Sequence, residues 1–201
     1  MNKSINHLTL TAAALFALTA NSARASTIFS FDNDTVGTST QFTDTVNGLS
    51  ATFTSSGDPG GFTIAPSIFQ ALTGNVLGDP GPAFLPNLTL TASFNTDLSA
   101  VDLLFATSDF VTASPFTLAA YEGNRLVGST TATGAFQGTF PEGEIAFSGA
   151  AFNTIVLSST ATDFAIDDVQ VSATPEPATA GMYLLTGLAL AGVSRFRGRR
   201  S

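Results

Sequence analysis

Between residues 26 and 172, apolar and polar side chains alternate in short runs with the period of two that β-strands show. In one such run Val101, Leu103 and Phe105 fall on a single face. No run keeps the spacing of 3.6 residues that a helix needs. The pattern predicts strands over residues 27–32, 49–55, 87–94, 99–107, 115–123, 124–132, 144–150, 152–159 and 163–172. Strands of this number and length indicate one all-β domain, a β-sandwich of the jelly-roll type over residues 26–172.

Glycine and proline separate several of these runs. The segments Gly57–Gly61 (GDPGG) and Gly78–Phe84 (GDPGPAF) cannot continue a strand, because proline lacks a backbone donor and glycine favours turns. Glu122–Asn124 (EGN) lies between two strand patterns and predicts a hairpin loop.

The last predicted strand contains a change of phase. Phe164 and Ile166 lie on one face, whereas Val169 and Val171 have the opposite parity. A slip of one residue would turn core side chains outward unless a bulge absorbs it. The pattern therefore predicts a bulge at Asp167–Asp168, which would hold an aspartate rigidly near a sheet edge.

Phenylalanine dominates the apolar positions of the predicted domain. Sixteen of the 18 phenylalanines lie between residues 26 and 172. Phenylalanine buries a large apolar area without needing a polar partner, so we expect these rings to form the core.

The charges are few and unevenly placed. Residues 26–172 hold 14 of the 15 acidic residues of the chain, and Arg125 is the only basic residue in that span. A body this acidic repels polyanions, which excludes nucleic acid as a partner, and it attracts divalent cations. The chain has no cysteine, so disulfides and thiol chemistry are excluded.

The first 25 residues have the composition of a secretory signal peptide. Lys3 gives a positive start, and Leu8–Ala20 is an apolar run too short to span a bilayer, which takes about 20 residues. Ala23 and Ala25 provide the small residues that a signal peptidase recognises. The sequence thus predicts an exported protein whose leader, residues 1–25, is removed.

The residue inventory argues against an enzyme. His7 is the only histidine and would leave with the leader, so neither a catalytic triad nor a zinc site is expected. Carboxylate chemistry remains, which makes a glycoside hydrolase one alternative. Against it, the body has no tryptophan and only one tyrosine, Tyr121, to line a sugar cleft. The adjacent acid pairs are Asp32 with Asp34, Glu142 with Glu144, and Asp167 with Asp168.

A structural calcium is a second hypothesis for these acids. Calcium takes six to eight oxygens, mainly from carboxylates and carbonyls. Asp32 and Asp34 follow the first strand, and Asp167 and Asp168 lie in the last one. They would form a site if the two strands were neighbours, and otherwise they are turn residues and solvated surface.

Three features follow the domain in order over residues 173–201. The segment TPEP at Thr174–Pro177 is extended, because each proline fixes its own φ and disfavours helix before it. Ala178–Ser194 carries no charge and would form a helix of ~25 Å, barely enough for a hydrocarbon core. By the positive-inside rule the final arginines stay in the cytoplasm and stop transfer; they are Arg195, Arg197, Arg199 and Arg200.

This tail resembles the PEP-CTERM sorting domain of Gram-negative bacteria that make exopolysaccharide. The matching features are Pro175, Glu176 and Pro177, the apolar helix, and the terminal arginine cluster. The resemblance implies recognition of the motif by an exosortase in the inner membrane. It also implies transient anchoring there, followed by transfer to the cell surface or extracellular matrix. The alternative is a membrane anchor that is never cut.

The end of the domain carries a weaker resemblance. The segment FAIDDVQVSATPEP is similar to the last strand of many PEP-CTERM proteins and of jelly-roll carbohydrate-binding and MAM-like domains. That likeness implies a structural calcium shared by Asp32 with Asp167 or Asp168. Our main expectation is an exported, non-enzymatic surface or matrix protein. The alternative is a carbohydrate-binding module, which a row of exposed phenylalanines, or Tyr121 beside a groove, would favour.

Overall fold

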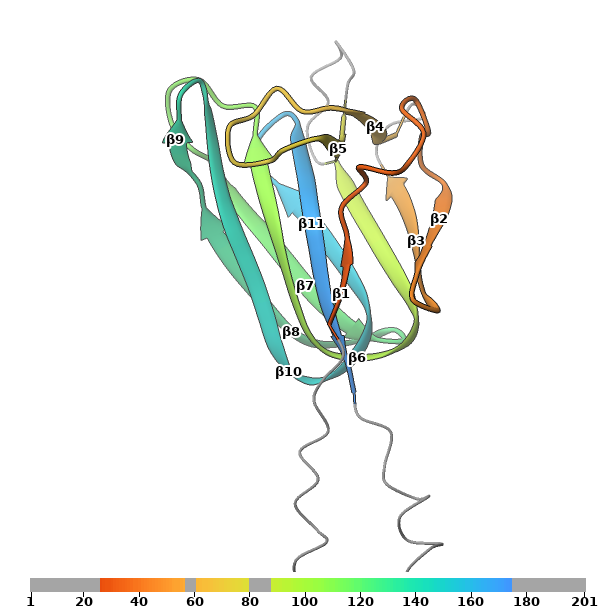
Figure 1. Cartoon of the computed structure of the whole chain (residues 1–201). Coiled ribbons are helices and arrows are strands. Elements are labelled where there is room, and N and C mark those ends of the chain that lie inside the picture. Colours follow the sequence, from red (N-terminus) through yellow and green to blue (C-terminus); the bar gives the residue numbers. More distant parts are fainter. Residues whose placement is uncertain (1–25, 57–60, 80–87, 175–201) are drawn as a thin grey trace, which may run out of the picture. The chain divides into compact units, whose positions relative to one another are not determined.

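The computed structural model describes residues 26–56, 61–79 and 88–174 (Figure 1). These residues contain eleven strands, joined by turns and loops, and no helix. The predicted all-β class is confirmed. The strands are β1 (Ser26–Phe29), β2 (Phe42–Val46), β3 (Leu49–Ser56), β4 (Thr63–Pro66), β5 (Asn75–Gly78), β6 (Thr89–Thr107), β7 (Pro115–Glu122), β8 (Arg125–Thr133), β9 (Ala135–Gln137), β10 (Phe140–Ser159) and β11 (Phe164–Ala173).

The predicted signal peptide, residues 1–25, lies outside the described residues, and so do the sorting motif and apolar segment after residue 174. Within the described ranges, no helix has the length and hydropathy needed to span a bilayer.

Two long strands, β6 and β10, build both layers of the sandwich. Each runs along one layer, turns at the lower end of Figure 1 and returns in the other layer. The two strands stay paired through the turn, where the β10 register shifts around Phe152. The sequence pattern predicts each of them as two separate strands. Their continuity explains why all eleven strands belong to one hydrogen-bonded network.

The remaining strands complete the two layers. The first layer places β11 beside the second half of β6, with β1 and β5 on the other side of β11 and β4 beyond β5. The first half of β10 and the short β9 finish it. The second layer contains, in spatial order, β2, β3, the first half of β6, the second half of β10, β7 and β8.

Phenylalanine rings fill the space between the layers. Phe105 of β6 stacks on Phe116 of β7 with ring centroids 4.4 Å apart, and Phe164 of β11 meets Phe116 edge-on at 5.1 Å. Phe29 and Phe53 pack across the other half of the sandwich at 6.4 Å. Each ring buried in this way contributes roughly 1.5–3 kcal/mol to folding. The predicted phenylalanine core is thus confirmed for nine rings.

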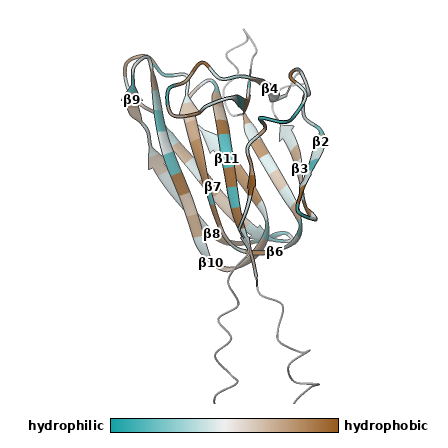
Figure 2. Ribbon diagram, viewed as in Figure 1, coloured by the Kyte–Doolittle hydropathy of each residue, from teal (hydrophilic) through white to brown (hydrophobic). Residues whose placement is uncertain are grey.

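The predicted bulge in β11 is also confirmed. Between Asp167 and Gln170 the pairing with β6 advances by one extra residue. Asp168 takes up that residue with φ 47°, a left-handed conformation that aspartate adopts more readily than most residues. Figure 2 shows the resulting mixture of hydrophilic and hydrophobic positions along β11. The expectation of a sheet edge is wrong, because β11 has partners on both sides. The bulge lies between the part of β11 that pairs with β5 and the part that pairs with β1.

Two tight hairpins follow the turn chemistry of their residues. The predicted loop between β7 and β8 is confirmed, since Glu122 pairs with Arg125 and Gly123 has φ 57°. The hairpin between β2 and β3 turns at Asn47 and Gly48, whose φ values of 54° and 83° are both positive. That arrangement fits the type I′ turn that Asn-Gly favours.

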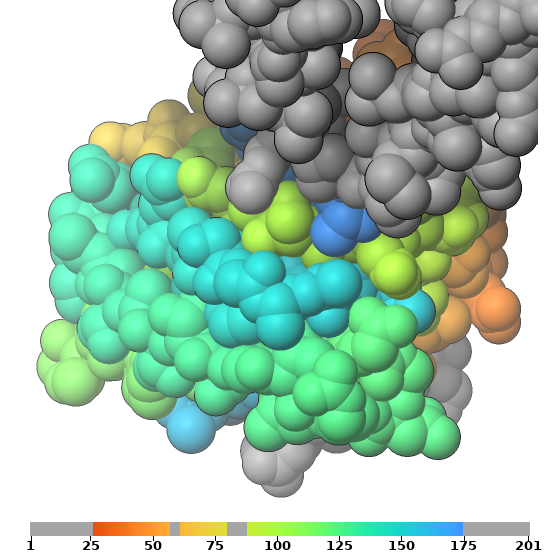
Figure 3. Space-filling model, turned by 90° about the horizontal axis from the view of Figure 1, so that it is seen from below, coloured from red at the N-terminus to blue at the C-terminus, as the bar shows by residue number. Residues whose placement is uncertain are grey.

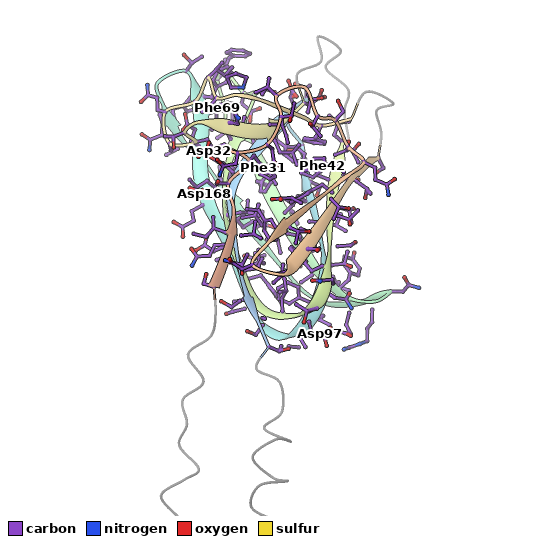
Figure 4. The ribbon with its side chains drawn as sticks, turned by 45° about the vertical axis from the view of Figure 1, so that its right-hand side comes forward. Phe31, Asp32, Phe42, Phe69, Asp97 and Asp168 are labelled. Carbon is purple, nitrogen blue, oxygen red and sulfur yellow. The ribbon has the colours of Figure 1, made fainter. Side chains whose placement is uncertain are left out.

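Both ends of the domain lie at the same end of the sandwich. Ser26 of β1 pairs with Ser172 of β11, and the amide of Thr174 donates to the carbonyl of Asp97 at 2.9 Å. Figure 3 views this end directly and shows the turns of β6 and β10 beside the β7–β8 hairpin. Asp97 marks it in Figure 4, and Phe69 marks the opposite end.

Candidate functional site

An open pocket of about 390 Å³ lies at the end of the sandwich opposite the termini. Its floor is made by β5 and the start of β11, through Val76, Gly78 and Ala165. Its walls come from the end of β4, the loop after it, the loop after β6 and the first residue of β10. We call it the loop-end pocket. Its lining residues are Ala65, Pro66, Ile68, Phe69, Val76, Gly78, Asp79, Ser108, Phe110, Phe140, Asp163, Phe164 and Ala165.

Three phenylalanines that are not fully buried line this pocket, and we call Phe69, Phe110 and Phe140 the rim phenylalanines. Phe140 contacts both of the others, with ring centroids 5.4 Å from Phe69 and 5.5 Å from Phe110. Phe110 is 66% exposed, and its neighbour Val111 is 88% exposed. Large apolar side chains this exposed, gathered around a pocket, are typical of a ligand surface.

The loop that carries Phe110 is fixed by one carboxylate. Asp109 accepts hydrogen bonds from the Thr107 hydroxyl at 2.8 Å and from the Ser114 amide at 2.8 Å. The Ser114 hydroxyl donates to its other oxygen at 2.9 Å. An aspartate that closes a loop in this way holds the backbone without burying it. Phe110 is therefore presented to solvent by an ordered turn.

The loop that carries Phe69, residues 67–74, is held over the outer face of the first layer; we call it the pocket loop. Glu142 of β10 is buried and accepts the Gln70 amide with both oxygens, at 2.9 and 3.1 Å, and the Ala71 amide as well. At the loop's two ends, the Ser67 amide donates to the carbonyl of Gly74 at 2.8 Å.

Two more predicted acids hold the far end of the pocket loop. Asp32 accepts the Asn75 amide at 2.9 Å, and Asp167 accepts the Thr73 amide and, at 2.8 Å, the Asp168 amide. Burial and the neighbouring carboxylates of Asp168 and Asp32 raise the pKa of Asp167 to about 7, although these amides oppose the shift. Carboxylates from three separate parts of the chain thus bind backbone amides of the pocket loop and of Asn75, the first residue of β5.

The four aspartates predicted as calcium ligands do not form one set. Asp167 lies within electrostatic range of both Asp32 and Asp168, but Asp34 is influenced by Asp44 of β2 instead. Among the described residues, no group of three or more acidic or other ligating side chains is placed to hold a metal ion. We assign the oxygens of Asp32 and Asp167 to backbone binding. The calcium site stays a prediction that this arrangement does not support.

Two further acids, Asp79 and Asp163, line the loop-end pocket itself. The register places them together, because Gly78 of β5 pairs with Ala165 of β11 and the two aspartates extend those strands. Burial, followed by the charge of Asp79, raises the pKa of Asp163 to about 6. Oδ1 of Asp163 is buried, and no described residue hydrogen-bonds to it.

The acid pair nearest to a hydrolase arrangement lies elsewhere. Asp102 and Glu144 point outward from β6 and β10 and hydrogen-bond to each other, and burial together with Glu144 raises the pKa of Asp102 to about 6. The two carboxyl groups of a retaining glycosidase stand about 5 Å apart across a cleft. Direct contact between Asp102 and Glu144 leaves no room for a glycosidic bond.

The pocket residues were missed in the sequence because the strand pattern does not mark them. Phe69 and Phe110 lie in loops, and Asp79 and Asp163 look like ordinary turn acids. The one available signal was apolar residues in short polar loops, as in Ile68-Phe69 and Phe110-Val111. Tyr121, the predicted sugar-facing aromatic, lies in β7 and is not among the lining residues.

Comparison with known proteins identifies the fold. No family model and no curated protein matches the sequence. The K2 cleaved adhesin domain of Lys-gingipain superposes with a TM-score of 0.52 at 14% identity, over 75% of this chain and 99% of that domain. The K1 cleaved adhesin domain of Lys-gingipain from Porphyromonas gingivalis W83 gives 0.46 at 14% identity, over 75% and 99%. The CBM22-1-GH10 modules of Clostridium thermocellum xylanase 10B, complexed with xylohexaose, give 0.40 at 13% identity, over 63% and 27%.

Only the first of these three structural similarities is close enough to support a conclusion about the fold. The second and third TM-scores are too low to carry an argument. At 14% identity, the first match shows a shared fold and nothing about ligands. The chain has the β-sandwich fold of a cleaved adhesin domain.

Proposed function

We propose that this chain is an exported, non-enzymatic module that binds polysaccharide in the loop-end pocket and is held at the cell surface or in the matrix through its tail. One observation carries the proposal. One exposed ring, Phe110, two half-buried rings and two carboxylates converge on an open pocket built on the ends of the strands.

The pocket offers both kinds of contact that a sugar needs. The apolar C–H face of a pyranose packs on aromatic rings, and its hydroxyls donate to carboxylates. The rim phenylalanines supply the rings, and Asp79 and Asp163 supply acceptors beside them. The volume of about 390 Å³ is within the range of small-molecule sites. Phe110, the exposed ring of this set, is the feature that favours the carbohydrate-binding alternative over a purely structural component.

Within the domain, the loop-end pocket and the last described residues lie at opposite ends of β11. β11 begins at Phe164, a lining residue of the pocket, and ends at Ala173. Ten residues of strand span roughly 30 Å. The segment that carries Pro175, Glu176 and Pro177 follows directly.

Binding is tested on an array of immobilised neutral, acidic and amino oligosaccharides, with the body expressed as residues 26–174. We expect at least one sugar class to bind, and the double variant Phe69→Ala/Phe110→Ala to lose that signal. Leu126→Ala is the matched control, because Leu126 is also an exposed apolar residue, at 52%, but lies in β8 outside the pocket. A double variant that binds as well as the parent would refute the site.

Sorting is tested by the intact mass of the protein recovered from its native host, with and without the exosortase. We expect a product shortened near Pro175–Pro177 only when the exosortase is present. A full-length tail in both strains would refute sorting and leave sugar binding untouched.

A further inference from the structure

The polar side chains of the loop-end pocket gather on neighbouring segments. They are Asp79, Ser108 and Asp163. The Ser108 amide donates to the carbonyl of Asp163 at 3.1 Å. The Asp79 amide donates to the carbonyl of Phe164, the next residue along the chain, at 3.3 Å. Apart from Gly78, the other lining residues carry apolar side chains. The pocket therefore suits a ligand with one polar part and one apolar part.

The floor of the pocket is apolar and buried. Val76 of β5 and Ala165 of β11 belong to a small apolar cluster that is separate from the main core. The same cluster contains Leu72 and Ala106. Ala65 of β4 pairs with Val76 and also lines the pocket. A hydroxyl placed against these side chains would lose its hydrogen bonds to water without replacement. The part of a ligand that reaches the floor is therefore apolar.

The apolar character continues from the floor to the rim. Val111, Ile68 and Phe110 are the three most exposed large apolar side chains of the described residues, at 88%, 74% and 66%. Ile68 and Phe110 line the pocket, and Val111 follows Phe110 in the same loop. Exposed apolar side chains gathered around a pocket indicate a ligand that buries them.

Building on the proposed function, we propose that the loop-end pocket selects neutral sugars that carry acyl esters, such as O-acetyl groups, over the same sugars without them. The methyl group of the ester enters the apolar floor beside Ala65 and Val76, and the sugar ring packs on the rim phenylalanines. The ring hydroxyls stay near the polar side chains and the open mouth of the pocket. Each part of the ligand then meets groups of its own polarity.

An unmodified sugar and a lipid chain each match only part of this lining. A sugar without esters would place hydroxyls or nothing against the apolar floor, and the burial of that floor would be lost. A hydrocarbon chain without a sugar would cover Asp79, Ser108 and Asp163 and remove water from their polar groups. An acylated sugar avoids both losses.

The experiment uses acetylated xylan and acetylated glucomannan oligosaccharides, both free of uronic acids, and the same preparations after alkaline removal of their esters. Titration calorimetry with the full-length protein measures the affinity of each. We expect the acetylated form of at least one backbone to bind at least about fourfold more tightly, the gain from burying one methyl group.

The other outcomes separate this inference from the proposed function. Equal affinity within both pairs, or no binding of either backbone while another sugar of the array binds, would overturn the acyl proposal and leave the proposed function intact. Absence of binding by any sugar, on the array or in solution, would overturn both. Sedimentation with phosphatidylcholine vesicles, without a preference between the sugars, would assign the apolar rim to lipid and refute the acyl proposal.

Two matched variants test whether the acyl group enters the floor. Ala65→Leu adds a side chain where Ala65 lines the pocket, and it should abolish the preference for the acetylated form. Ala146→Leu makes the same change at an exposed position of β10 outside the lining and should leave the preference unchanged. A preference that survives in both variants would refute the placement of the acyl group. Thermal melts show whether each variant is folded, and Ala65→Val, which adds less volume, repeats the test if Ala65→Leu is not.

Discussion

The interior and the loop end of this domain use the same side chain for opposite purposes. Phe105, Phe116 and Phe164 lie on strands, face one another between the layers and are buried. Phe69, Phe110 and Phe140 also form a contacting set of three, but Phe69 and Phe110 lie on loops and the set lines an open pocket. An aromatic cluster is therefore not in itself a sign of a core.

The difference lies in what supports each set. The core rings are held by the regular pairing of β6, β7 and β11, so burying them stabilises the whole sandwich. The rim rings are held by carboxylates that bind loop backbone, Asp109 for one loop and Glu142 for the other. Those hydrogen bonds fix partly or mostly exposed apolar groups in place, which a binding surface needs and a folding core does not.

The largest expected effect separates the two sets by stability. Phe105→Ala should lower the free energy of unfolding by about 3–5 kcal/mol, because it removes a fully buried ring and leaves a cavity. Phe110→Ala should lower it by less than about 0.5 kcal/mol, since that ring is mostly exposed. Urea denaturation followed by circular dichroism measures both. Comparable losses in the two variants would show that the rim rings belong to the core.

The next effect tests whether a carboxylate holds the pocket loop. Glu142→Gln should lower the free energy of unfolding by roughly 1–3 kcal/mol. The new side-chain amide would turn an N–H donor toward the backbone N–H donors of Gln70 and Ala71, where the carboxylate offers only acceptors. It should also weaken sugar binding, since Phe69 lies on the released loop.

Glu144→Gln is the matched control for this loop prediction. Glu144 lies two residues further along β10 but is exposed and faces Asp102. Urea denaturation and the sugar array should show little change in this variant. If Glu142→Gln behaves like Glu144→Gln in both measurements, the pocket loop is held by other contacts.

The strand framework could be predicted because burial imposes a period of two on it. The faces of Val101, Leu103 and Phe105, and even the phase slip at Asp167–Asp168, follow from that period. The joining of two runs into one continuous strand, in β6 and in β10, could not be predicted. Each half of such a strand keeps its own alternation, so the pattern looks the same as that of two separate strands. The short β4, β5 and β9 are too brief for a period to show.

One missed element left a readable signal. Asn47-Gly48 stands between FTDTV and LSATF, the pattern of a two-residue hairpin, and predicts β2. The acids were harder to interpret, because a carboxylate that binds a loop amide, such as Asp32, has the same local sequence as a metal ligand. Which of the two it becomes depends on the tertiary position of residues 73–75, and no local pattern encodes that.

The smallest expected effect distinguishes a titrating group that affects folding from one that affects binding. The pKa of Asp167 is raised from its ordinary value of 3.8 to about 7 by burial and by its carboxylate neighbours. Between these values the folded state holds a proton that the unfolded chain has released, so stability falls as pH rises. This contribution is fully present below about pH 4 and is lost as pH rises through 7. Its size should be of order 1 kcal/mol once relaxation is allowed for.

Urea denaturation at a series of pH values between 4 and 7.5 measures this loss. The parent domain should lose stability across the range, because the raised pKa values of Asp102 and Asp163, each about 6, act in the same direction. Asp167→Asn should flatten the curve between pH 5 and 7.5. Asp163→Asn should flatten it less, because its pKa is raised less, and it should weaken sugar binding, because Asp163 lines the loop-end pocket. A curve for Asp167→Asn as steep as that of the parent would mean that the buried carboxylate is already compensated in the folded domain. The amides of Thr73 and Asp168 would then be sufficient to hold its charge.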